Sequence, residues 1–255
     1  MNTRPFFWHN LSAMTRSKNV GASVPLAQRP ARAGRSHPHQ ILGLLLFLIA
    51  GLQLPARAQE AAVVTFTLDF PGSEPSHYAI SVSSDGRSTY DSDGKLSPES
   101  EGDPFHLDFS MSAESRQRIF ELAERAHYFQ GEINSKKKNL ASTGSKTLTY
   151  KDSGRNTSAT YNYSPVAAVQ QITQLFQSLS LTLEFGRRLQ YFHRYQKLAL
   201  DEELKRMEEA ANGQGLEEVS AVVPILQAIA SDTTVINPVR ARAQRMMERA
   251  KSVQR

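Results

Sequence analysis

The chain has 255 residues and no cysteine, and it carries 30 Lys and Arg side chains against 25 Asp and Glu, a formal net charge of +5. Such an excess suggests an acidic partner such as nucleic acid or a membrane surface. However, seven of the basic side chains and none of the acidic ones lie in residues 1–58, which leaves 23 basic and 25 acidic groups in residues 59–255. Charge therefore gives no support for nucleic acid, and the lack of cysteine excludes both a disulfide framework and a lipid-anchoring cysteine.

Residues 1–58 are typical of a secretory signal with an over-long, disordered n-region. An uncharged apolar run begins at Ile41 and ends at Leu54, which as a helix would be about 21 Å long and thus short for a membrane span. Ala56 and Ala58 then supply the small-x-small pattern that signal peptidase recognises. We expect cleavage after Ala58 and a bacterial protein that is periplasmic or secreted. The alternative is an uncleaved anchor, in which case this apolar run is the chain's only contact with the membrane.

Alternation of apolar and polar residues predicts four strands in the next part of the chain, at 62–70, 77–83, 87–90 and 105–109. Asp85-Gly86 predicts a hairpin turn between the second and the third, because this pair tolerates positive φ. The acidic segment before the fourth strand predicts a solvated loop. Asp91 and Asp93 resemble the start of a calcium loop, but Gly94 stands two places early, so a flexible loop is favoured over a calcium site.

Apolar spacing of three and four residues predicts a first helix at 113–127, with Ser112 as its N-cap. A second hairpin unit follows, with extended segments predicted at 140–143, 146–152 and 157–163. Ser164 and Pro165 favour the start of the next helix. Residues 178–185 alternate with period two, but helical patterns flank them, so a continuous helix with a kink near Gly186 is predicted. Three more helices are predicted at 201–211, 216–230 and 238–253.

This order of elements predicts an α+β fold. An antiparallel sheet made from two hairpin units, with packing helices, is expected over residues 59–180. An all-helical C-terminal extension is expected over residues 181–255.

Several segments carry a resemblance to a known group of proteins. They are Tyr78 to Val82 with Asp85-Gly86, Tyr128-Phe129, the hairpin from Lys146 to Tyr163, and the sequence TLEFGRRL at 182–189. On these segments the chain is similar, over about 62–253, to uncharacterised exported proteins of soil bacteria such as acidobacteria. Its N-terminal part resembles a small α+β domain of unknown function. The resemblance implies export and an α+β fold, and it implies no activity.

The last two predicted helices resemble one repeat unit of the HEAT type, through Leu226, Asp232 and Val239-Arg240 in that order. A solenoid needs about three such units. The resemblance therefore implies a single helical hairpin that packs on the main domain.

No motif in the sequence assembles a catalytic set. The chain has no GxSxG elbow, no P-loop and no HExxH sequence. The four histidines after residue 58 lack the spacing that would bring two metal ligands onto one helix face; they are His77, His106, His127 and His193. The sequence therefore predicts no catalytic residues, no metal and no cofactor.

The densest polar cluster lies among aromatic residues and comprises Glu184, Arg187, Arg188 and Arg194. The first three have the three- and four-residue spacing at which side chains meet on a helix. Guanidinium groups bind carboxylates and other anions bidentately, so one hypothesis is an anion clamp. The favoured hypothesis is a structural ion-pair cluster that fixes the helical extension to the sheet domain.

For the whole protein we expect a binding or interaction module of the cell envelope that is not an enzyme, with another envelope protein or a polymer as its partner. The alternative is a carboxylate-based hydrolase, because paired carboxylates leave little signature in a sequence. An exposed patch would favour binding. Two acids with a raised pKa in one pocket would favour the enzyme.

Overall fold

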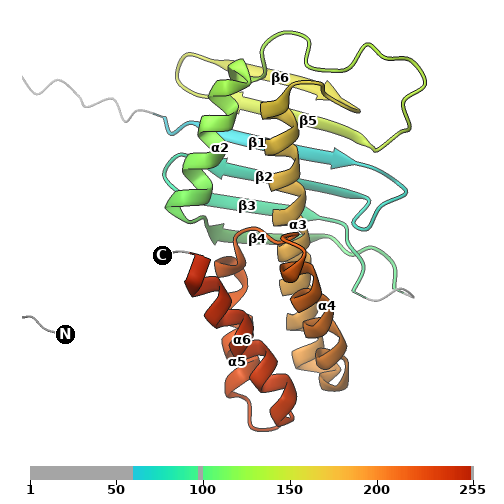
Figure 1. Ribbon diagram of the computed structural model, residues 1–255, viewed down its shortest axis with the longest axis vertical. Coiled ribbons are helices and arrows are strands. Elements are labelled where there is room, and N and C mark those ends of the chain that lie inside the picture. Colours follow the sequence, from blue (N-terminus) through green and yellow to red (C-terminus); the bar gives the residue numbers. More distant parts are fainter. Residues whose placement is uncertain (1–59, 97–99, 254–255) are drawn as a thin grey trace, which may run out of the picture. The chain divides into compact units, whose positions relative to one another are not determined.

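The computed structural model describes residues 60–96 and 100–253. Six strands are present: β1 (Val63–Asp69), β2 (His77–Ser83), β3 (Arg87–Ser92), β4 (Phe105–Ser110), β5 (Ser145–Lys151) and β6 (Asn156–Tyr161). Five α-helices accompany them: α2 (Ala113–Arg125), α3 (Ala167–Tyr195), α4 (Leu200–Asn212), α5 (Val223–Ser231) and α6 (Asn237–Val253). The α+β fold and the helical C-terminal part are thereby confirmed (Figure 1). Among these residues no helix combines the length and the apolar character that a membrane span requires.

The strands form one antiparallel sheet in the order β4-β3-β2-β1-β5-β6. Its centre is β1, where Phe66 lies opposite Ile80 of β2 on one side and Leu148 of β5 on the other. All three side chains are fully buried. Because side chains alternate along a strand, this register directs the apolar residues of the central strands to one face of the sheet.

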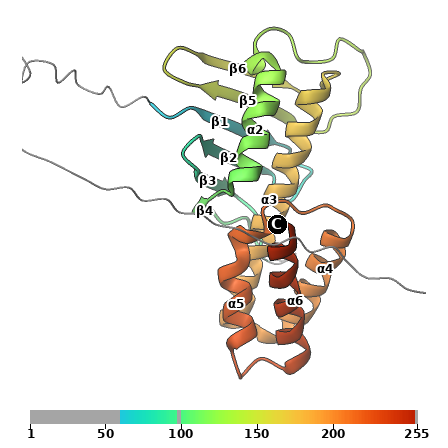
Figure 2. The same cartoon turned by 60° about the vertical axis from the view of Figure 1, so that its left-hand side comes forward.

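Helices α2 and α3 cover that apolar face (Figures 1 and 2). Helix α2 begins as predicted, with the Ser112 hydroxyl accepting a hydrogen bond from the Ser115 amide at 3.3 Å, and it buries Ile119 and Leu122. No described helix lies on the other face of the sheet, which is therefore open in this part of the chain.

Helix α3 crosses the strands from one edge of the sheet to the other. Near its start Thr173 hydrogen-bonds to Tyr161 of β6. One turn further on, the Phe176 ring stacks on Phe66 of β1 with 5.3 Å between centroids. The helix then continues past the sheet, so that one straight element belongs to two hydrophobic cores. The first core includes α3 residues up to Leu183, and the second begins at Phe185 and is completed by α4, α5 and α6.

The expected division after residue 180 lies close to this change of core, but it falls inside α3. A cut there would remove the last turn of α3 that seals the sheet core, including Leu183, which is 1% exposed. The sheet part and the helical extension are thus joined by a shared helix.

Four local predictions were wrong. The α-helix expected at 216–230 begins only at Val223, after a 3₁₀ turn at Val219–Val222. Residues 140–143 form no strand. Gly144 follows them with φ +88° and turns the chain into β5. A Cβ at Gly144 would lie only 2.6 Å from Cβ of Phe70, so this position also has no room for a side chain. Helix α3 begins at Ala167, because the Ser164 hydroxyl accepts from the Val166 amide at 3.2 Å and closes a turn ahead of the helix.

The fourth error concerns Gly186, where a kink was expected. Helix α3 runs through this position without a break. A Cβ at Gly186 would lie 2.5 Å from Cγ1 of Val222, in the 3₁₀ turn that precedes α5. The glycine therefore permits close packing of that turn against α3 and does not bend the helix.

Candidate functional site

The structure brings Glu184 into a buried polar network beneath the edge of the sheet. One carboxylate oxygen, Oε1, accepts hydrogen bonds from the hydroxyls of Tyr90 at 2.8 Å and Ser92 at 2.7 Å, both on β3. Ser180, one turn earlier on α3, lies 3.0 Å from the same Tyr90 hydroxyl. Burial raises the pKa of Tyr90, and the Glu184 charge raises it further, so the phenol stays protonated and acts as the donor.

Arg187 holds the loop between β3 and β4. Its Nη1 and Nη2 donate to the carbonyl oxygens of Gly94 and Asp103, each at 2.9 Å, and its guanidinium lies 4.9 Å from the centroid of the Phe105 ring. The second oxygen of Glu184, which accepts no hydrogen bond in the described structure, lies 3.9 Å from Nη1. The side chains of Arg187 and Glu184 are only 5% and 3% exposed.

The other two arginines of the predicted cluster differ in their surroundings. Arg188 reaches α4, where its Nε donates to Glu203 at 2.6 Å. Arg194 lies apart on the exposed end of α3, with its guanidinium 5.2 Å from the centroid of the Tyr195 ring. Three of the four predicted residues are thus together, and they bind β3, a loop and α4. This geometry supports the structural hypothesis over the anion clamp. Arg187 is buried, and Arg187 and Arg188 already donate to groups of the protein, so an anion could bind only by displacing these partners.

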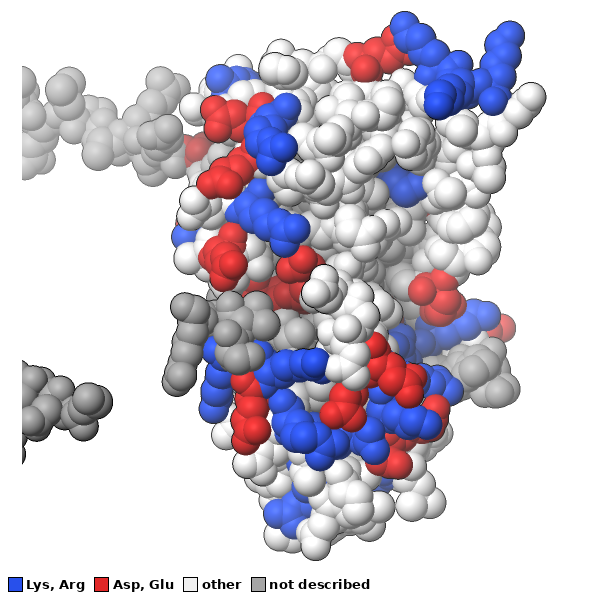
Figure 3. Space-filling view, in the orientation of Figure 1, with Lys and Arg blue, Asp and Glu red and all other residues white. Residues whose placement is uncertain are grey.

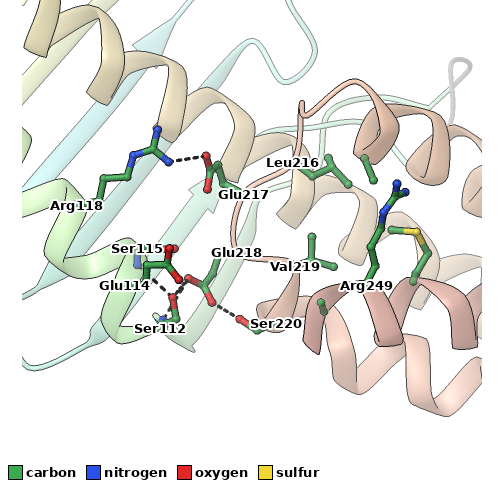
Figure 4. A pocket seen from close by; sticks show the side chains of 13 residues that line it. Ser112, Glu114, Ser115, Arg118, Leu216, Glu217, Glu218, Val219, Ser220 and Arg249 are labelled. Carbon is green, nitrogen blue, oxygen red and sulfur yellow. Dashed lines mark hydrogen bonds and ion pairs between the residues drawn. The ribbon is translucent and has the colours of Figure 1, made fainter. Parts of the chain in front are cut away.

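A cavity of about 160 Å³ lies where the helical extension meets the start of α2 (Figure 4). Glu218 closes its polar side: one oxygen accepts from the hydroxyl and the amide of Ser112, at 2.7 and 3.2 Å. Arg118 donates to Glu217 at 3.1 Å in the same wall. The opposite wall is apolar and includes Ala211, Leu216, Val219, Met246 and Ala250. Ser112 is the N-cap of α2, and anions are stabilised at a helix N-terminus. The Glu218 carboxylate therefore already occupies the position at which an anionic ligand would bind to the start of α2.

A buried lysine on β5 was not singled out from the sequence. Lys146 is 4% exposed, and its ammonium donates to the carbonyl oxygens of Thr143 and Asn162 and to the Thr143 hydroxyl, at 2.7 to 3.0 Å. Burial lowers the pKa of Lys146, but these three acceptors, with the Gly144 carbonyl as a longer fourth at 3.4 Å, satisfy the three protons of an ammonium group. Its role is to hold the segments that flank the second hairpin. The sequence did contain a signal for this buried lysine: in β5, Lys146 stands at one of the alternate positions whose side chains point into the core.

The open face of the sheet carries polar side chains in rows that follow the strand register. One row crosses all six strands: Asp108, Thr89, Ser81, Thr65, Thr149 and Ser158. Within it, the hydroxyls of Thr65 and Ser81 lie 3.0 Å apart. The next row runs through His106, Asp91, Ala79, Thr67, Thr147 and Thr160. The sequence patterns contained these residues as the polar half of each strand, and their alignment into rows depends on the pairing.

This face presents almost no apolar surface. Val63 and Ala79 are its only apolar side chains within β1 to β6, and histidine is its only ring. A shallow hollow of about 650 Å³, lined in part by Ser81, Arg87 and Asp108, lies toward one end of it. The open face is thus broad, flat and rich in hydrogen-bonding groups.

Two histidines on the open face pair with carboxylates. His77 Nδ1 lies 2.5 Å from Asp69, and His106 Nδ1 lies 2.7 Å from Asp91. The hydrogen bond with Asp91 raises the pKa of His106. Across residues 60–96 and 100–253, no three side chains of His, Asp or Glu are placed to hold a metal ion.

The pKa shifts of the carboxyl groups bear on the hydrolase alternative. Those with a shifted pKa are Asp85, Asp93, Asp152, Glu208 and Asp232. In all five the pKa is lowered; hydrogen bonds or charges from neighbouring basic groups and amides stabilise the ionised form. A general acid needs a raised pKa, so these five do not suit that role.

Ala56, Ala58 and the apolar run from Ile41 to Leu54 lie outside the described residues, so the predictions of cleavage and export stay predictions. No protein-family model matches the chain, and a search of curated proteins finds no match either.

Proposed function

We propose that the protein is an exported binding module of the cell envelope, without catalytic activity, and that it binds a polar polymer through the open face of the sheet. The observation that carries the proposal is the registered row of six polar side chains from Asp108 to Ser158. With strands about 4.8 Å apart, the row presents regularly spaced donors and acceptors along about 24 Å.

The chemistry of the face favours a polymer over a protein partner. Protein interfaces concentrate aromatic, Met and Arg side chains at their centre, and the centre of this face, around Thr65 and Thr149, holds none. Hydroxyl groups can both donate and accept, which suits a partner rich in hydroxyl and amide groups. A cell-wall glycan has this chemistry.

The test is co-sedimentation of the purified exported chain with insoluble cell-wall polymer. Thr149→Lys places a long charged side chain on the row and should block contact between the polymer and the neighbouring hydroxyls. We therefore expect the affinity for the polymer to fall roughly tenfold, which corresponds to about 1.4 kcal/mol of binding free energy. The matched control is Gln117→Lys, the same charge change on the exposed face of α2, which should bind like the unaltered chain. Equal binding by both variants, or no binding by the unaltered chain, would contradict the proposal.

The same samples separate the other candidate functions. Soluble fragments released from the polymer over time would support the hydrolase instead. A photo-reactive side chain at Thr65 that cross-links to one envelope protein, when the same group at Gln117 does not, would replace the polymer with a protein partner on the same face.

A further inference from the structure

Large apolar side chains are exposed at the end of the helical extension: at the last residue of α3, in the turn after α3, and in the turn between α5 and α6. Leu198 is 95% exposed, and Tyr195 and Ile236 are each 62% exposed. We call residues 193–199 and 232–240 the tip. Exposed apolar residues are common singly, but three that gather at one end of a molecule require an explanation.

Contacts between the two turns show that these side chains belong to one surface. The ammonium of Lys197 donates to Asp232 at 2.6 Å and also to the hydroxyl of Thr234. His193 lies 3.0 Å from the same carboxylate. The turns that carry Leu198 and Ile236 are therefore held side by side.

The tip is basic as well as apolar, and the acidic residues that follow it at the start of α4, Asp201 and Glu202, pair with Arg242 and Arg206. It contains three cations, Arg194, Lys197 and Arg240, and a single carboxylate, Asp232, which Lys197 and His193 already engage. Within the described chain neither Arg194 nor Arg240 takes part in an ion pair; Arg240 donates to the Ala230 carbonyl. On the face drawn in Figure 3, the lowest part of the molecule shows neutral and basic side chains and no acidic ones.

We propose that the tip inserts its apolar side chains into the surface of an anionic phospholipid bilayer. The tip is formed by two turns at the end of a helical bundle (Figures 1 and 2), so it projects, and a flat, deformable surface accepts a projection that a rigid groove would have to match. Leu and Ile bury in the acyl boundary, Tyr prefers the headgroup level, and Arg and Lys are attracted to anionic headgroups. This contact would be separate from the apolar run of residues 41–54.

The cysteine-free sequence makes a site-specific test possible with the chain as it is recovered from expressing cells. A polarity-sensitive dye is attached to Leu198→Cys, to Ile236→Cys and, as the matched control, to Glu209→Cys near the other end of α4. Phosphatidylglycerol vesicles should shift the emission of the first two dyes to the blue and leave the control dye unchanged. Vesicles of phosphatidylcholine alone should give a weaker response.

Two variants test the parts of the tip separately. Leu198→Glu with Ile236→Glu should abolish the response of a dye placed at Tyr195→Cys, and circular dichroism should show an unaltered fold because both side chains are exposed. Arg194→Gln and Arg240→Gln should each weaken binding to anionic vesicles about fivefold, since a cation near such a surface contributes about 1 kcal/mol.

Three results would overturn the proposal: no blue shift at position 198 with anionic vesicles, an equal shift at position 209, or a blue shift that rises with protein concentration without vesicles. The last result would mean that a second copy of the chain covers the tip. None of these results depends on the open face of the sheet, so failure here and failure of the polymer proposal are distinguishable.

Discussion

At the scale of single residues, Glu184 is a buried charged side chain at the junction between the sheet and α3. Its carboxylate accepts from two hydroxyls of β3 and lies beside the buried Arg187. Removal of one partner from a buried ionic group costs much more than the group itself contributes, because the remaining charge stays buried without compensation.

Glu184→Ala should therefore lower the free energy of unfolding by about 3–5 kcal/mol. The measurement is urea unfolding followed by circular dichroism. Arg194→Ala is the matched control from the same predicted cluster, and since Arg194 is exposed its effect should stay within about 0.5 kcal/mol. Equal small effects in both variants would mean that the buried network contributes little to the free energy of unfolding. The anion-clamp hypothesis would then be favoured over the structural one.

At the scale of elements, the packing of the helical extension against α3 depends on the missing side chain of Gly186. In an ordinary helix, Gly→Ala stabilises by roughly 1 kcal/mol. Here the added methyl would meet Val222 at 2.5 Å, so the extension would have to move.

Gly186→Ala should destabilise the protein by about 1–3 kcal/mol, the usual cost of overpacking. The test is a double-mutant cycle with Val222→Ala. The second substitution removes the methyl that clashes, so the double variant should be more stable than the sum of the two single changes predicts. Strict additivity would show that the close contact is not the reason for the glycine.

Sequence patterns specified most of the elements, because each has one apolar face with the correct period. They identified β1, β2 and the cap of α2, and they resolved residues 178–185 as helix since the flanking pattern was longer than the alternation. They gave the wrong reason for Gly186, because its neighbour Val222 is 36 positions away in the chain and no local pattern encodes that contact.

The candidate surfaces were harder to foresee for the same reason. The spacing of Glu184, Arg187 and Arg188 predicted their proximity on one helix, but not that their partners would be β3, a loop and α4. The rows on the open face depend on a register across six strands. The tip depends on two turns that meet through Lys197 and Asp232.

At the scale of the whole molecule, the sharing of α3 between two cores makes the sheet part and the helical extension thermodynamically dependent. Leu183 belongs to one core and Phe185 to the other, so unfolding of α3 across these two residues would disrupt both cores.

We expect equilibrium unfolding of residues 59–255 in a single transition, without a state in which only the extension is unfolded. Hydrogen exchange followed by mass spectrometry checks this, since the slowest amides of β1 and of α6 should open with the same free energy. Opening of α6 at a much lower free energy would show that the extension unfolds independently.

The length of α3 has a geometric consequence. Over 29 residues, a helix advances about 43 Å, and each residue turns it by about 100°. One residue gained or lost between Ser180 and Gly186 would turn all later residues of α3 by about 100°, so the side chains that face the sheet core and those that face the second core could not both keep their contacts. Natural variants of this chain should therefore accept substitutions in this segment more readily than any change in its length.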